Sequence, residues 1–67
     1  MRTNILKGKI MMAGYTQRTL AEEMKMSKNT LNAKVNGRVA LNTDEVVRLC
    51  DLLHIVDDSE KAYIFLT

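Results

Sequence analysis

Apolar residues recur along much of this chain at the spacing that buries one face of a helix. The clearest stripe combines residues at i, i+3, i+4 and i+7: Val46, Leu49, Cys50 and Leu53. Asn42 followed by Glu45 resembles a capping box, in which each side chain binds a free backbone N–H of the first turn. We therefore predict a helix that begins after Asn42 and ends near Leu53.

A second stripe lies near the N-terminus, where three apolar residues stand at i, i+4 and i+7: Leu6, Ile10 and Ala13. Thr3 and Asn4 both carry side chains that can cap a helix, and either one would start it. Gly14 would end it, because glycine adopts the left-handed conformation of a helix stop at little cost. The pattern thus predicts a first helix between these caps and Gly14.

Two shorter helices are predicted between these stripes. The first, Gln17–Met24, has Thr16 as its cap. Its inward face would be formed by Leu20, Ala21 and Met24. The small side chain of Ala21 suits a place where two helices cross closely.

A turn at Lys25 and Met26 separates this helix from the next, residues 28–36, which Ser27 would cap. Two apolar residues at i and i+4 form its inward face: Leu31 and Val35. Gly37 would end it. The two helices and their turn together span residues 17–37.

The tail, residues 57–67, is compatible with two structures. Three residues can cap a fifth helix: Asp57, Asp58 and Ser59. Three apolar residues fit a helical period: Ala62, Phe65 and Leu66. The sequence YIFLT at residues 63–67 also has high strand propensity. We predict a short helical turn followed by an extended end.

Length and composition limit the classes of protein that this chain can belong to. With 67 residues, of which 46% are hydrophobic, we predict one all-α domain, residues 1–67, folded as a compact bundle of four to five short helices. No apolar run approaches the roughly 18 residues of a membrane span, and no secretory leader is recognisable, so we expect a cytoplasmic location. His54 and Cys50 are single residues of their kind. We therefore predict no metal, cofactor or catalytic residue, and no enzyme activity.

Charge is distributed unevenly along the chain. Residues 1–43 carry eight basic and two acidic side chains, for a net +6, whereas residues 44–67 carry two basic and six acidic side chains, for a net −4. A basic first part and an acidic last part are typical of a protein that meets a polyanion with one face. The distribution by itself fits a nucleic acid as the partner and, equally, solvated charges that cluster by chance.

Residues 17–37, with the sequence QRTLAEEMKMSKNTLNAKVNG, resemble the helix-turn-helix of phage repressors and Cro proteins, the XRE-type family. The resemblance rests on Gln17 opening one helix, on Leu20 and Ala21, and on Ser27 and Leu31 in the next helix, which a final Asn-Gly closes. It extends over about residues 6–55 and implies a lambda-repressor-like fold. One departure is Lys25, which stands where the family usually has glycine, and a positive φ there would cost roughly 1 kcal/mol.

The resemblance implies that the second helix of the pair lies in the major groove of DNA. Five residues would then contact bases: Ser27, Lys28, Asn29, Asn32 and Ala33. An asparagine amide can pair in bidentate fashion with adenine, and a lysine can donate to guanine acceptors. Ala33 is small enough to let the helix sit deep and can touch a thymine methyl group.

Backbone phosphates would be contacted by five further residues: Gln17, Arg18, Thr30, Lys34 and Arg38. Gln17 lies at a predicted helix N-terminus, where backbone N–H groups attract anions. Such contacts fix the position of the protein on the duplex without reading its sequence.

The function implied is that of a transcriptional regulator, a phage or prophage repressor or Cro-like protein that occupies an operator as a homodimer in a bacterial cell or phage-infected host. The dimer surface would lie in residues 38–41, in the following helix or in the tail, where Tyr63, Ile64 and Phe65 would either form an apolar patch or cover the core. We expect a complete small regulator, although the binding domain of a longer repressor would have the same features.

The alternative is a protein-interaction module. In that case the helix-turn-helix is a scaffold, and the chain acts on another regulator as an antirepressor or antitoxin-type partner does. Salt separates the two hypotheses, because direct binding to phosphates weakens steeply as the salt concentration rises.

Overall fold

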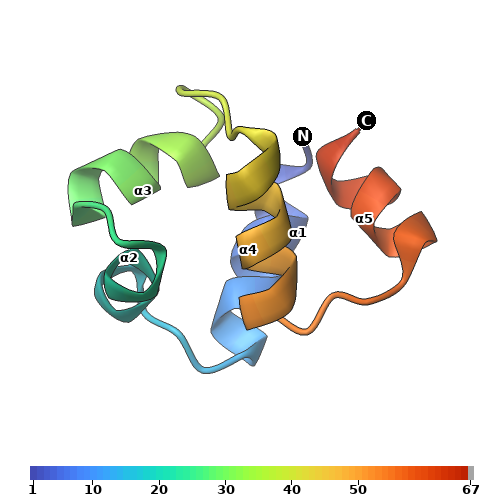
Figure 1. Ribbon diagram of the computed structural model, residues 1–67, viewed down its shortest axis with the longest axis horizontal. Coiled ribbons are helices and arrows are strands. Elements are labelled where there is room, and N and C mark those ends of the chain that lie inside the picture. Colours follow the sequence, from blue (N-terminus) through green and yellow to red (C-terminus); the bar gives the residue numbers. More distant parts are fainter. Residues whose placement is uncertain (67) are drawn as a thin grey trace.

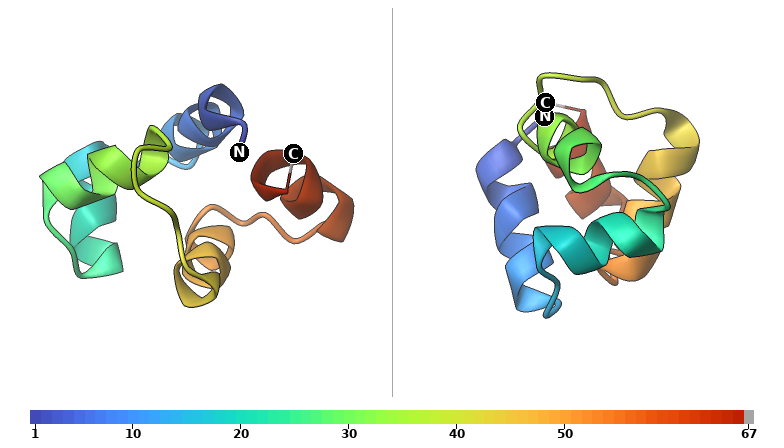
Figure 2. Two further views of the ribbon diagram at one scale, coloured as in Figure 1. Left: turned by 90° about the horizontal axis from the view of Figure 1, so that it is seen from above. Right: turned by 90° about the vertical axis from the view of Figure 1, so that its left-hand side faces the viewer.

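The computed structural model describes residues 1–66, which form five helices and no strand: α1 (Thr3–Met12), α2 (Gln17–Met24), α3 (Lys28–Val35), α4 (Thr43–Leu52) and α5 (Asp58–Phe65). The all-α class and the number of helices agree with the prediction. Figure 1 shows α2 and α3 together at one end of the molecule and α5 at the other, with α1 and α4 between them. The view from above in Figure 2 shows the same separation.

One core joins all five helices. Its buried residues, drawn from every helix and from the segment after α4, are Leu6, Ile10, Leu20, Ala21, Leu31, Val35, Leu49, Cys50, Leu53, Ile55 and Ile64. The apolar stripes predicted around α2, α3 and α4 supply most of them. Ala13 was predicted to face inward but is exposed, because α1 ends at Met12 and Ala13 lies beyond its last turn.

Helix boundaries follow local capping chemistry in four of the five helices, of which α5 is described below. Thr16 accepts a hydrogen bond from the Thr19 N–H at the start of α2, and the Thr19 hydroxyl accepts one from the Thr16 N–H. Asn42 and Glu45 form the predicted capping box of α4. Ser27 caps α3 as predicted. These side chains satisfy backbone N–H groups that have no partner inside the helix.

The start of α1 is different, and the predicted caps are wrong there. Thr3 is already helical, and Arg2, at the N-cap position, makes no side-chain capping bond. Instead the Arg2 N–H donates to the Ile64 carbonyl at 2.8 Å, and its guanidinium lies 4.3 Å from the centre of the Tyr63 ring. Docking of the N-terminus onto α5 therefore decides where α1 begins.

The tail prediction is also wrong in the region the structure describes. Residues 58–65 form a complete helix instead of a single turn with an extended end, and Asp57 caps it by accepting from the Ser59 N–H. Ile64 is fully buried in the core, and Lys9 on α1 forms an ion pair with Glu60 at 3.1 Å. Tertiary burial thus overrides the strand propensity of these residues. The predicted end at Thr67 lies outside the described residues.

Because Ile64 packs into the core, α5 should contribute to the stability of the whole domain. We expect Ile64→Ala to lower the free energy of unfolding by about 2–5 kcal/mol, through lost burial and the cavity left behind. Urea denaturation followed by circular dichroism measures this change. Val56→Ala, at a position that is 84% exposed, is the matched control and should change stability by less than about 0.5 kcal/mol. Equal effects of the two substitutions would contradict a structural role for α5.

Candidate nucleic-acid interface

The turn between α2 and α3 is built around Lys25 in the left-handed conformation, with φ 56° and ψ 45°. Its N–H donates to the Glu22 carbonyl at 3.2 Å, and the Met26 N–H donates to the Ala21 carbonyl at 3.0 Å. These bonds close the end of α2 and direct the chain into Ser27. Lys25 therefore adopts the backbone geometry that glycine usually provides, at a cost of about 1–2 kcal/mol.

Burial of one side of α3 fixes which of its residues face solvent. Leu31 and Val35 are fully buried. Lys28 and Asn29 are exposed, and Asn32 and Ala33 are partly exposed. At about 100° per residue, these four solvent-facing residues, Lys28, Asn29, Asn32 and Ala33, share one side of the helix. The structure therefore brings together four of the five residues predicted to contact bases.

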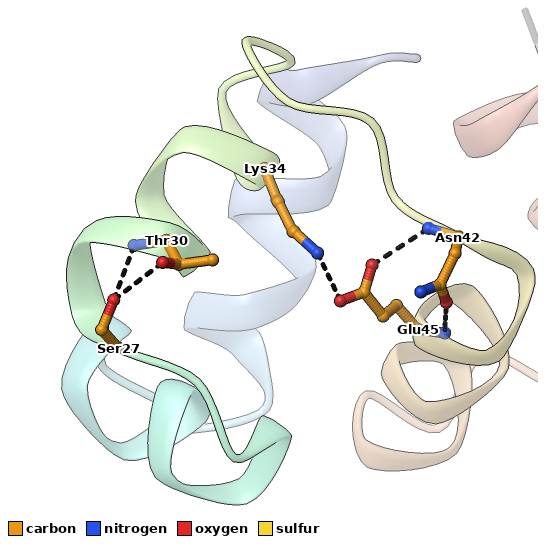
Figure 3. Close-up of polar contacts among 5 residues, drawn as sticks. All are labelled: Ser27, Thr30, Lys34, Asn42 and Glu45. Carbon is orange, nitrogen blue, oxygen red and sulfur yellow. Dashed lines mark hydrogen bonds and ion pairs between the residues drawn. The ribbon is translucent and has the colours of Figure 1, made fainter.

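The fifth residue, Ser27, is used mainly as a cap. Its hydroxyl oxygen accepts a hydrogen bond from the Thr30 backbone N–H at 3.1 Å, and its hydroxyl donates to the side-chain oxygen of Thr30 at 2.8 Å, as Figure 3 shows. Because its only proton is bound within the protein, Ser27 can offer a base no more than a lone pair. The proton of the Thr30 hydroxyl has no acceptor among residues 1–66, so Thr30 is a suitable donor to a phosphate.

A shallow hollow lies where the start of α2 approaches the start of α3. It is lined by Thr16, Gln17, Arg18 and Lys28. Gln17 and Arg18, which are predicted to contact phosphates, therefore adjoin the same surface as Lys28, which is predicted to contact a base and lies about ten residues later in the chain. The positive side chains of Arg18 and Lys28 and the N-terminal end of α2 all favour an anion there.

The structure gives Lys34 a different partner from the phosphate predicted for it. Figure 3 shows its side chain extending from α3 to Glu45 at the start of α4, where the two form an ion pair. The two side chains are only 14% and 17% exposed. Lys34 thus connects two helices, and its ammonium is paired with a carboxylate of the protein itself. Arg38 is exposed, and its N–H donates to the Ala33 carbonyl at 2.9 Å, which folds the chain back over the end of α3.

Ionisation of Glu45 is favoured by these neighbours. The hydrogen bond from Lys34 lowers the pKa of the Glu45 carboxyl, and the Asn42 N–H lowers it further, whereas burial acts in the opposite direction. Glu45 therefore joins the capping box of α4 to the C-terminal half of α3. Away from this surface, burial raises the pKa of the Cys50 thiol, which suits its place in the core.

One polar contact, which lies on the side of α3 that carries Asn32, was not predicted from the sequence. The Asn36 amide nitrogen donates both to the Asn32 carbonyl and to the Asn32 side-chain oxygen, each at 2.8 Å. The signal was present, because amide side chains four residues apart on a helix are neighbours and can bond to each other.

The ion pair predicts a specific dependence of stability on pH. Because the pKa of Glu45 is lower in the folded state, ionised Glu45 stabilises the protein at pH values above 4.5, the ordinary pKa of this group. This stabilisation is lost as the pH falls through the lower pKa of the folded state. We expect Glu45→Gln, which cannot titrate, to be about 1 kcal/mol less stable at pH 7 and to lose less stability below pH 4.5 than the unmodified protein. Urea unfolding measured between pH 7 and pH 3 tests this expectation.

Glu22→Gln, at an exposed acid on α2, is the matched control and should keep the pH profile of the unmodified protein. Parallel profiles for Glu45→Gln and the unmodified protein would show that the pair does not stabilise the fold.

The other arrangements that often mark a functional site are not found in residues 1–66. They contain no group of three or more histidine, cysteine or carboxylate side chains that could hold a metal ion. None of their helices has the length and apolar character needed to cross a bilayer.

Comparison with known proteins assigns the chain to a family without a described activity. No curated protein and no solved structure is detectably similar to it. The family described as "Protein of unknown function (DUF739)" matches residues 3–67, which is nearly the whole chain. The protein therefore belongs to the DUF739 family.

Proposed function

We propose that this protein is a sequence-specific regulator of transcription that binds double-stranded DNA through α3. The observation that carries this proposal is the solvent-facing side of α3, which combines Lys28, Asn29 and Asn32 with the small Ala33 and carries no acidic residue. These side chains can recognise both purine bases, because amides bind adenine and lysine binds guanine.

The major groove is about 12 Å wide and admits one helix with short side chains toward the bases. With α3 in the groove, Asn29 and Asn32 would pair with adenines, and Lys28 would donate to guanine. Ala33 would contact a thymine methyl group. The packing of Leu31 and Val35 supports this role, because it holds the inward side of α3 on the core.

Phosphate contacts would come from the hollow at the start of α2 and from both ends of α3. Arg18 and Gln17 would bind one phosphate together with the first N–H groups of α2. Thr30 would donate its hydroxyl, and Arg38 would reach the backbone from the loop after α3. Lys34 is left out of this set because its ammonium is paired with Glu45.

We propose further that the protein binds as a homodimer and blocks transcription by occupying its operator. Half-sites about 34 Å apart require two copies of a domain 29 Å long to lie next to each other. An apolar groove without a charged side chain suits this contact, and it is lined by Met1, Gly37, Val39, Ala40, Leu41, Thr43, Val46, Phe65 and Leu66. The patch predicted at residues 63–65 is not a continuous surface, because Ile64 is buried.

A protein-interaction module remains the second candidate, and one observation favours it. Met11 and Met12 at the end of α1 are 78% and 82% exposed, although they are apolar. Adjacent exposed methionines are suited to adaptable contacts with another protein. This role and DNA binding use different surfaces, so measurement of DNA binding distinguishes them.

Selection of bound sequences from random duplexes is the direct test of the proposed function. We expect one preferred sequence with twofold symmetry, and a log–log dependence of affinity on salt with a slope of about −0.9 for each phosphate neutralised. Absence of any sequence preference at physiological salt would overturn the proposal and leave the protein-interaction module.

Substitution of one amide separates base reading from general DNA binding. We expect Asn32→Ala to cost about 1–3 kcal/mol on the selected site and little on random DNA, because the lost contacts are to a base. Fluorescence anisotropy with both duplexes measures this difference. Arg18→Ala is the comparison variant and should weaken binding to both duplexes alike. Similar losses on the two duplexes for Asn32→Ala would rule it out as a base-reading residue.

A further inference from the structure

Asn32 and Asn36 lie one helical turn apart at the C-terminal end of α3. The side-chain nitrogen of Asn36 donates one hydrogen to the Asn32 carbonyl and the other to the Asn32 side-chain oxygen, both at 2.8 Å. Both side chains are partly buried. Within residues 1–66, the side-chain amide of Asn32 forms no other hydrogen bond.

These two bonds determine the orientation of both amides. A backbone carbonyl only accepts hydrogen bonds, so the atom of Asn36 that faces it must be the nitrogen. The second hydrogen of that nitrogen meets Asn32, so the atom of Asn32 in this position must be its oxygen. The Asn32 nitrogen, with both of its hydrogens, therefore faces away from Asn36. The oxygen keeps one lone pair for another donor.

We propose that Asn36 is a positioning residue that sets the base preference of Asn32. The inference rests on the proposed function, since it concerns how α3 reads DNA. With the amide held in one orientation, its N–H meets the N7 acceptor of adenine, and its remaining lone pair meets the adenine amino group. Guanine would place a second acceptor against the amide oxygen, and cytosine would place a donor against the amide N–H. Release of Asn32 would let it rotate and tolerate these bases.

The side chain of Asn36 is not required to end the helix. Its backbone N–H donates to the same Asn32 carbonyl at 3.0 Å, and Gly37 then turns the chain with φ 79°. Asn36→Ala should consequently fold with the same helix boundaries. This separation allows the amide contact to be removed while α3 stays in place.

The test repeats the selection from random duplexes with the full chain carrying Asn36→Ala. We expect the preference for adenine over the next best base, at the one pair read by Asn32, to fall about tenfold, while affinity for random DNA stays within about twofold. Asn4→Ala, at an exposed asparagine of α1, is the matched control and should leave the selected sequence unchanged. In an Asn32→Ala background, Asn36→Ala should have no further effect on that base pair, as expected for residues that act through one contact.

Nuclear magnetic resonance of the free protein gives a readout that does not involve DNA. The order parameter of the Asn32 side-chain amide should be high in the unmodified protein and should fall in Asn36→Ala, whereas the backbone values of α3 stay unchanged. An equally mobile Asn32 amide in the two proteins would overturn the inference. Unchanged discrimination by Asn36→Ala would overturn it as well and leave the proposed function standing. If the unmodified protein shows no sequence preference, the proposed function itself fails and the inference falls with it.

Discussion

Burial of Leu31 and Val35 is the interaction on which the rest of the structure depends. Both side chains are fully buried, and they anchor α3 to a core that draws residues from every helix. A chain of 67 residues has little apolar surface to spare, so its folded state tolerates few losses from that core. On the same helix Lys28 and Asn29 are exposed, and Asn32 is partly exposed. The same packing thus stabilises the domain and defines its candidate DNA-binding surface.

Hydrogen bonding divides the polar residues of α3 into two groups. Ser27, Lys34 and Asn36 are bound to partners within the protein, respectively Thr30, Glu45 and Asn32. The side chains of Lys28 and Asn29 are exposed. In the first group Ser27 and Asn36 bond within α3 and its ends, whereas Lys34 links α3 to α4; the second group is open to a ligand. Rigid support around a few open polar groups is what precise recognition requires.

Charge follows the same division in space. Residues 1–43, with their helices and loops, carry the basic excess, and the acidic residues 57, 58 and 60 lie in or beside α5. Figure 1 shows α5 at the opposite end of the molecule from α2 and α3. An acidic end far from α3 would favour one orientation of approach to a polyanion. The Lys9–Glu60 and Lys34–Glu45 pairs reduce the number of free charges near the centre of the molecule.

The sequence by itself determined the features that depend on neighbouring residues. The four helices up to Leu52, the caps Thr16, Ser27 and Asn42, and the inward residues of α3 all follow from local spacing and hydrogen bonding, which act within one or two turns. Tertiary structure decided whatever required contact between distant segments. The sequence of the tail is compatible with a helix and with an extended end, and burial of Ile64 against the core favours the helix. Only the approach of α4 gives Lys34 its partner Glu45. The Asn36–Asn32 contact, by contrast, joins residues one helical turn apart, so their spacing in the sequence already makes them neighbours.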